Sequence, residues 1–117
     1  MLKVYQCKKC GKTVISKEEL KLEGWQELVA GSTDAAQKKH VPVVTKKCKT
    51  VKVDVGSVAH PMTAEHLIEW VALETEQGYQ VQYLKVDAAP VCEFKLADGD
   101  KAVRVYAYCN LHGLWAS

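Results

Sequence analysis

The chain lacks the features that would place it in a membrane or on an export pathway. Its apolar stretches are short and interrupted, so none reaches the roughly 20 residues of a membrane-spanning helix. The first residues, MLKVYQCKKCGK, lack the apolar centre of a signal peptide. We therefore expect a cytoplasmic protein without a membrane partner.

The chain also lacks a large charge excess and an even number of cysteines. A net charge of +2 over 117 residues gives little support to a nucleic-acid partner, since such proteins carry concentrated basic surface, and none is expected. Five cysteines without an export signal argue against a disulfide framework and favour metal or redox chemistry. Cys48 and Cys92 are expected to be ordinary buried cysteines.

From residue 41 onward, polar and apolar residues alternate with the period of β-strands. The alternation is clearest over residues 51–55, 79–83, 92–96 and 103–109. Asp-Gly-Asp at 98–100 predicts a hairpin turn. Residues 67–73 are apolar on both faces and predict either a buried strand or a short helix. Several short strands separated by turns predict an all-β sandwich.

The first 36 residues have a different character. CKKCG at 7–11 predicts a tight knuckle, and GSTDAAQKK at 31–39 predicts a polar connector. We expect a small N-terminal module and connector over residues 1–36, too short for a substantial core of its own. A sandwich domain is expected over residues 37–117. No internal repeat is evident in the sequence.

All four histidines lie in predicted connectors: His40, His60, His66 and His112. Cys109 continues the core-facing side of its predicted strand, three residues before the last histidine. Loops at the rim of a sandwich are where a metal site can be assembled. Scattered surface histidines and an inert buried cysteine are the simpler alternative.

The number of candidate ligands bears on the metal. Four imidazoles and one thiolate exceed the four ligands of tetrahedral zinc. Blue-copper sites use two histidines, a cysteine and an axial methionine, and Met62 is the only plausible methionine. Five ligands on a six-coordinate metal leave one position open, which suits redox chemistry at a thiolate-bound iron. Two alternatives stay open: a copper electron-transfer site, and a structural zinc site made of Cys7, Cys10, Cys109 and His112.

Three segments, KKHVP, HPMTAEHLIEW and CNLHGLW, resemble the signature segments of superoxide reductases, the neelaredoxin and desulfoferrodoxin family. The resemblance extends from the connector to the C-terminus. It implies an immunoglobulin-like β-sandwich of about seven strands with one mononuclear iron per chain. It also implies one-electron reduction of superoxide to hydrogen peroxide, a rubredoxin-like electron donor, and a homodimer or homotetramer.

The matching motifs carry the family's site onto particular residues. They imply four equatorial imidazoles and an axial thiolate as iron ligands: His40, His60, His66, His112 and Cys109. Lys39 would attract superoxide and order a proton-donating water. The backbone amide of Leu111, with that of the next residue, would hydrogen-bond the sulfur and set the potential. Trp70 and Trp115 are expected to pack near the site.

Two positions depart from the family pattern. In many members a glutamate directly before the lysine caps the oxidised iron, whereas this chain has Lys38 at that position. We therefore expect a ferric site that is five-coordinate or capped by water, hydroxide or an external anion, with Glu65 or Glu69 as alternative caps. The CKKCG knuckle resembles half of a desulforedoxin module, but the second pair of cysteines is missing. We therefore expect no second, FeS4-type iron. Cys7 and Cys10 are then thiols without a role, free or disulfide-linked, or share a metal between two chains.

Overall fold

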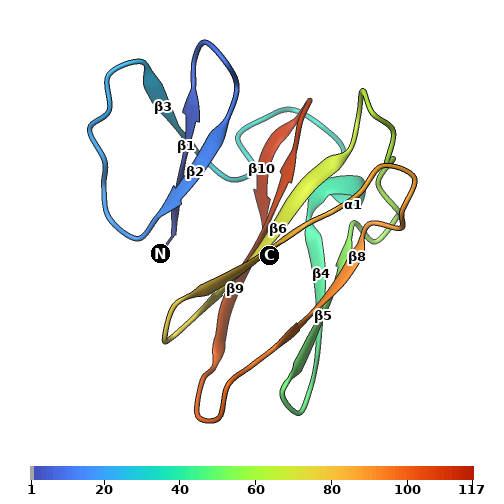
Figure 1. The fold of residues 1–117 in the computed structure, drawn as a ribbon. Coiled ribbons are helices and arrows are strands. Elements are labelled where there is room, and N and C mark those ends of the chain that lie inside the picture. The colour runs from blue at the N-terminus through green and yellow to red at the C-terminus, as the bar shows by residue number, and fades with distance from the viewer. Residues whose placement is uncertain (1) are drawn as a thin grey trace.

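The computed structural model describes residues 2–117, and its strands form three antiparallel sheets (Figure 1). The N-terminal sheet has the order β2 (Thr13–Ser16), β1 (Lys3–Cys7), β3 (Trp25–Leu28). The four-stranded sheet has the order β10 (Gly113–Ala116), β9 (Ala102–Cys109), β6 (Ile68–Thr75), β7 (Tyr79–Tyr83). The three-stranded sheet has the order β4 (Pro42–Lys47), β5 (Thr50–Val55), β8 (Val91–Lys95). A single helical turn, α1 (Gln37–His40), precedes β4, and no helix within residues 2–117 is suited to crossing a membrane.

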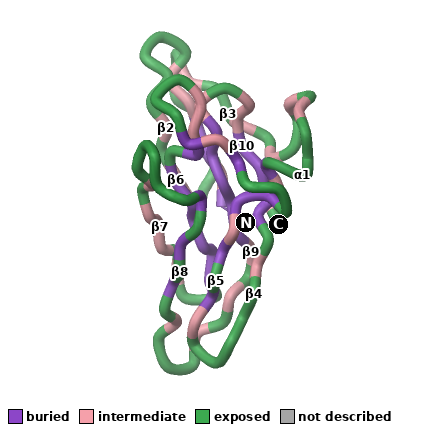
Figure 2. The backbone as a smooth tube through the Cα atoms, turned by 90° about the vertical axis from the view of Figure 1, so that its right-hand side faces the viewer, coloured by how far each residue is buried: buried purple, intermediate pink, exposed green. Residues whose placement is uncertain are grey.

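The four-stranded and three-stranded sheets enclose the main core of the molecule. Val51, Val53 and Val55 of β5 point inward and are fully buried. The opposite sheet contributes alternate residues of β9, among them Val105 and Ala107. Figure 2 shows buried backbone concentrated in β5, β6 and β9. The expected all-β sandwich of about seven strands is confirmed, because the two sheets contain four and three strands.

Residues 67–73 predicted either a buried strand or a short helix. In the structure, residues 68–73 form most of strand β6, which is covered on both faces. Its inward residues belong to the main core, while Trp70 and Ala72 point outward into a second apolar cluster. Tyr106 and Tyr108 of β9 join this cluster. The sequence placed only one face of β9 in a core. The second face is buried because the N-terminal sheet lies on it.

The N-terminal sheet has no core separate from the sandwich, as expected from its length. Its buried residues Leu2 and Val4 pack into the second cluster. Gln6 Nε2 donates a hydrogen bond to the Tyr108 hydroxyl at 2.8 Å, and Trp70 Nε1 donates to Thr13 Oγ1 at 3.1 Å. We retain as a proposal that residues 1–36 form a module distinct from the sandwich domain of residues 37–117.

The two remaining cysteines have different surroundings. Cys92 is buried in the main core, and burial together with Asp54 raises the pKa of its thiol to about 11. The expectation that Cys48 is buried is wrong. Residues 48 and 49 form the tight turn between the paired ends of β4 and β5, and Cys48 is exposed there with a φ of 53°.

Replacing Phe94 should show how much the main core contributes to stability. Phe94 in β8 is 1% exposed, and Phe94→Ala should lower the free energy of unfolding by about 3–5 kcal/mol, because it leaves a cavity. Urea unfolding measures the change. Val103→Ala is the control, since this side chain is 54% exposed and should lose less than about 0.5 kcal/mol. Equal losses in the two variants would contradict the assignment of the core.

Candidate metal centre

Five potential ligands converge at the end of the sandwich where β6 begins (Figure 1). His40 is the last residue of α1, and His60 and His66 come from the loop between β5 and β6. Cys109 is the last residue of β9, and His112 lies in the turn before β10. Four separate segments thus bring together all the side chains that the sequence motifs selected.

The four imidazoles form a closed ring around a common centre. Centroids of neighbouring rings lie 4.7 Å apart for His40 and His60 and 4.6 Å apart for His60 and His66. The ring closes through His112, at 5.0 Å from His66 and 4.9 Å from His40. His40 and His66 lie across the ring at 6.3 Å. Neighbouring planes are nearly perpendicular, at 73° to 89°, which is the arrangement of four ligands around one ion.

The outer nitrogens of two rings fix which inner nitrogens carry lone pairs. His40 Nδ1 lies 2.7 Å from the carbonyl oxygen of Ala36, and His60 Nδ1 lies 2.6 Å from that of Pro61. A carbonyl only accepts, so both Nδ1 atoms carry the proton and donate. The two Nε2 atoms of the neutral rings therefore hold lone pairs, yet they lie 3.2 Å apart. A cation between them would turn this repulsive contact into two favourable ones.

The protonation equilibria of the rings favour metal binding as well. Burial lowers the pKa of His40, His60 and His66, and that of His60 falls to about 4. Neutral imidazole is the form that binds a metal. His66 Nε2 is buried without a hydrogen-bond partner, which is costly unless another group fills the gap. These observations fit a metal ion at the centre of the ring.

The thiol of Cys109 lies against the imidazole ring from the core side. Its sulfur is fully buried, 3.4 Å from His60 Nε2 and 4.0 Å from His112 Nδ1. Metal–nitrogen bonds of about 2.1 Å and a metal–sulfur bond of about 2.3 Å at right angles would bring neighbouring donors to about 3 Å. The contact with His60, at 3.4 Å, is slightly wider than that, and the contact with His112, at 4.0 Å, is clearly wider. The donors are therefore preorganised for one ion.

Backbone amides act on the same sulfur. Burial raises the pKa of Cys109, while hydrogen bonds from the backbone N–H groups of His112 and Leu111 act in the opposite direction. Such bonds stabilise the thiolate over the thiol. The side chain of Leu111 itself is 60% exposed, so only its backbone acts on the sulfur.

Trp115 of β10 holds two of the candidate ligands. Its ring stacks on His40 at a centroid distance of 4.8 Å, and its Nε1 donates to the carbonyl oxygen of His112 at 3.0 Å. Trp70, which the sequence also placed near the site, lies instead on the outer face of the four-stranded sheet, stacked on Tyr108 at 5.6 Å. The two tryptophans therefore have separate tasks.

Asn110 was missed in the sequence, although it joins two segments that carry ligands. Its Oδ1 accepts a hydrogen bond from the backbone N–H of Leu67 at 3.0 Å, and its Nδ2 donates to the carbonyl oxygen of Glu65 at 3.2 Å. Both partners flank His66. An asparagine directly after Cys109, in a turn that ends in glycine, is a signal of such side chain–backbone bonding.

Gly56 was also missed, and it positions the turn that carries Lys39 and His40. Its φ is +84°, and a Cβ atom there would lie 2.4 Å from the carbonyl oxygen of Val58 and 2.6 Å from that of Lys38. The N–H of Val58 donates to the same Lys38 oxygen at 2.9 Å. Only glycine allows α1 to approach β5 so closely.

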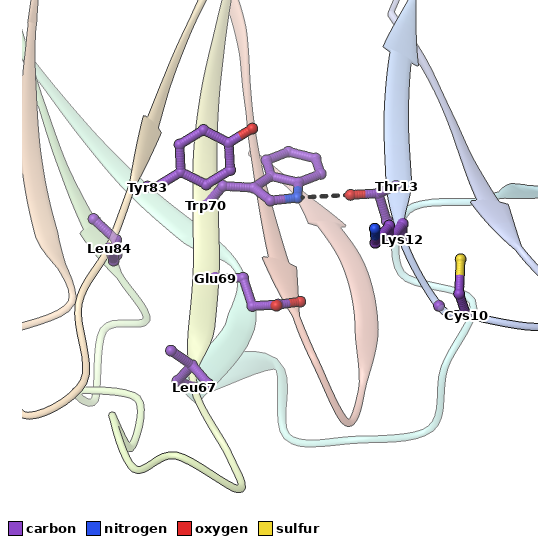
Figure 3. Close-up of a pocket in the computed structure, with 9 residues that line it drawn as sticks. Cys10, Lys12, Thr13, Leu67, Glu69, Trp70, Tyr83 and Leu84 are labelled. Carbon is purple, nitrogen blue, oxygen red and sulfur yellow. Dashed lines mark hydrogen bonds between the residues drawn. The ribbon is translucent and has the colours of Figure 1, made fainter.

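Charged residues around the cluster are distributed unequally. Lys39 is exposed, and its positive charge contributes to the lowered pKa values of His40 and His66. Glu69 lies in a cavity of about 500 Å³ between the N-terminal sheet and the four-stranded sheet (Figure 3). Burial and, as a smaller cause, the charge of Glu69 raise the pKa of Cys109. Glu65 is exposed in the loop before His66.

The arrangement weighs against both alternative metals. The Cys109 sulfur faces the main core, whereas Cys7 and Cys10 belong to the N-terminal sheet on the other face of the four-stranded sheet. The four-ligand zinc set is therefore not assembled. Four imidazoles are twice the number in a blue-copper site. A thiolate and four imidazoles fit iron with one position left open. Fold and donors together define a β-sandwich protein with a metal-binding cluster of histidines and a cysteine.

Comparisons with known proteins agree with this class. A sequence model of the family described as Desulfoferrodoxin matches residues 32–117. A desulfoferrodoxin of Syntrophotalea carbinolica is 40% identical over 126 aligned positions, covering 99% of this chain and 95% of that protein. The solved structure of the superoxide reductase from Treponema pallidum is 48% identical, with a TM-score of 0.77, and the match covers 80% of this chain and 77% of that one. A superoxide reductase (1Fe-SOR) from Giardia intestinalis is 32% identical with a TM-score of 0.59, covering 68% and 95%. The chain belongs to the desulfoferrodoxin family.

Gly56→Ala should disrupt the metal centre without touching a ligand. The new Cβ would meet two backbone oxygens, so α1 must shift, carrying His40 with it. We expect the variant to lose most of its bound metal and at least about 1–3 kcal/mol of stability. Metal per chain by mass spectrometry and urea unfolding test this.

Gly99→Ala is the matched control for that variant. Gly99 has a φ of +80°, but a Cβ atom added to it would have no neighbouring atom within 4 Å. The substitution therefore imposes the same backbone strain, about 1 kcal/mol, without the clash. Full metal content in Gly56→Ala would show that the close approach of α1 and β5 does not position the site.

Proposed function

We propose that the protein is a superoxide reductase that holds one iron ion per chain, with His40, His60, His66, His112 and Cys109 as ligands. The closed ring of four imidazoles with a buried thiol on one side carries this proposal. The ring and the sulfur supply five ligands from the chain. An ion that accepts a sixth ligand would then have one open position for a small substrate.

The bound iron would supply the electron chemistry, passing one electron to each superoxide and regaining it from a donor, and an anionic sulfur ligand favours its higher oxidation state. The reaction is balanced when each superoxide takes up one electron and two protons and leaves as hydrogen peroxide. The chain must therefore attract an anion, protonate it and release a neutral product.

Lys39 is proposed to attract the substrate. Its exposed ammonium group lies beside His40 and His66, so it adds positive charge close to the open position. Such charge raises the rate of encounter with a small anion by about one to three orders of magnitude. The same group can hold a water molecule that delivers a proton to the substrate.

The backbone amides that face the Cys109 sulfur are proposed to tune electron donation. Hydrogen bonds from Leu111 and His112 withdraw charge from the thiolate and so set how strongly it stabilises oxidised iron. Both amides belong to the short turn between β9 and β10. The turn therefore fixes the ligand and its electronic environment together.

The open side is proposed to have no carboxylate cap from this chain. The position before Lys39 is occupied by Lys38, and Glu69 lies in the cavity between the N-terminal sheet and the four-stranded sheet. Release of the product would then depend on solvent or on external anions rather than on a chain carboxylate. No second iron is proposed, because Cys7 and Cys10 are the only cysteines of the N-terminal sheet. A rubredoxin-like donor, a cytoplasmic location and a homodimer or homotetramer complete the proposal.

Metal analysis combined with product stoichiometry tests the proposed activity. We expect one iron per chain, and one hydrogen peroxide for each superoxide with one donor electron consumed. Cys109→Ser should abolish the thiolate-to-iron absorption band, whereas Cys48→Ser, at an exposed turn, should retain it. Oxygen and peroxide formed in equal amounts without consumption of the donor would indicate dismutation and would overturn the proposal.

The role of Lys39 is tested by Lys39→Ala beside Lys38→Ala. Both variants remove one exposed positive charge from α1, but only Lys39 acts on the pKa values of the histidines. Lys39→Ala should lower the second-order rate constant with superoxide by about tenfold or more and weaken its salt dependence. The loss in Lys38→Ala should stay below about threefold. Equal losses in the two variants would show that Lys39 acts only through the net positive charge of the protein.

A further inference from the structure

The CKKCG knuckle is the one motif that the proposed function leaves unused. Cys7 ends β1, and Cys10 lies in the turn that leads to β2. The turn is closed at both ends, by Gly11 N–H to the Cys7 carbonyl oxygen and by Cys7 N–H to the Lys12 carbonyl oxygen, each at 2.9 Å. Backbone hydrogen bonds thus fix the shape of the knuckle.

The knuckle brings two free thiols together at the surface. Both cysteines are unpaired, Cys10 is exposed, and Cys7 is half-buried. The backbone N–H of Cys10 donates to Cys7 Sγ at 3.4 Å. Residues three apart in a turn have Cα atoms within about 7 Å, and a disulfide needs about 4.4–6.8 Å. The two sulfurs can therefore form a bond with little movement of the backbone.

The surroundings of Cys7 favour the reactive form of its sulfur. Hydrogen bonding to the backbone N–H of Cys10, then to its side chain and to the backbone of Lys9, lowers the pKa of the Cys7 thiol. The thiolate is the nucleophile in cysteine chemistry. Lys8, Lys9 and Lys12 surround the pair with positive charge. Cys7 is thus suited to attack, and Cys10 to resolve the product.

We propose that Cys7 and Cys10 form a peroxide-reactive dithiol that consumes hydrogen peroxide and closes to an intramolecular disulfide. The source of the peroxide rests on the proposed function, since superoxide reduction would release it from the same molecule. The pair is open to solvent, so the product reaches it by diffusion.

The proposed step balances in atoms and electrons. The Cys7 thiolate attacks one peroxide oxygen, the O–O bond breaks, and the departing hydroxide takes a proton to become water. Cys7 is now a sulfenic acid. The Cys10 sulfur displaces its hydroxyl group, which leaves as a second water with the Cys10 proton. Two thiols are oxidised and one peroxide is reduced to two waters; a reduced dithiol would reopen the disulfide by exchange.

The dithiol is also connected to the strand that carries the thiol ligand. Gln6 Nε2 lies 3.1 Å from the carbonyl oxygen of Gly11 in the knuckle and 2.8 Å from the hydroxyl of Tyr108. Tyr108 directly precedes Cys109. Figure 3 shows Cys10 at the edge of the cavity that also holds Glu69. A change in the shape of the knuckle on oxidation would therefore alter contacts on the outer face of β9.

Cys48 is a matched control within the same molecule. It is also free, exposed and flanked by lysines, and it lies in a tight turn between β4 and β5. It has no thiol at a neighbouring position of its turn. Unspecific oxidation should affect it as much as the pair. A faster reaction at the knuckle therefore measures the contribution of the paired arrangement.

The experiment treats the reduced, iron-loaded protein with hydrogen peroxide, blocks remaining thiols and maps the peptides by mass spectrometry. We expect a disulfide between Cys7 and Cys10 to form about tenfold or more faster than Cys48 is oxidised. In Cys10→Ser, Cys7 should stop at the sulfenic acid, which dimedone traps. In Cys7→Ser, the remaining Cys10 should react no faster than Cys48. Circular dichroism verifies that both variants fold.

Three results would overturn the proposal of a peroxide-reactive dithiol. The pair could stay reduced, it could oxidise no faster than Cys48, or it could prove to hold a metal beyond one iron per chain that is lost in Cys10→Ser. A second run supplies superoxide and donor in place of peroxide, with and without catalase. The disulfide should form during turnover and be suppressed by catalase. If turnover yields no peroxide, the proposed function fails, while the first run still decides the chemistry of the dithiol.

Discussion

The structure depends on histidine ring nitrogens whose lone pairs point toward one another at the buried end of the sandwich. Two imidazoles that donate their protons to backbone carbonyls turn bare nitrogens toward each other, and a third buries a nitrogen without a partner. Such an arrangement is unfavourable on its own. A metal ion relieves it, so binding of the ion contributes directly to folding at this end of the sandwich. The rest of the fold has to hold these groups together against their repulsion.

Paired strands and fixed side-chain contacts hold the histidines and Cys109 together. The strand that ends in Cys109 pairs with β6 on one side and β10 on the other, while the stacked indole of Trp115 and the amide of Asn110 fix the loops. His60, His66 and His112 lie in connectors, where the backbone is free to aim each ring, and His40 ends the single turn of α1. The end of a rigid strand next to adaptable loops is a common basis for metal and catalytic sites.

The sequence predicted β5, β7, β8 and β9 and selected the candidate ligands, because both leave local signals. Alternation marked Val51 and its neighbours, and short spacings marked the ligand motifs. Other features depend on contacts between distant segments. Gly56 matters only because another backbone presses on it, and the outer face of β9 is buried only because a separate sheet covers it. The expectation that Cys48 is buried was wrong, because Cys48 lies in the tight turn between the paired ends of β4 and β5. A side chain in such a turn is exposed, whatever its apolar character.

The second apolar cluster joins the N-terminal sheet to the sandwich through buried side chains. Trp70, Tyr106 and Tyr108 are nearly inaccessible only while the N-terminal sheet lies on them. A chain that discarded this sheet would present a broad aromatic surface to its neighbours, and such surfaces invite aggregation. The sheet is thus a cover for one face of the sandwich, and this task depends on its apolar side chains rather than on its cysteines.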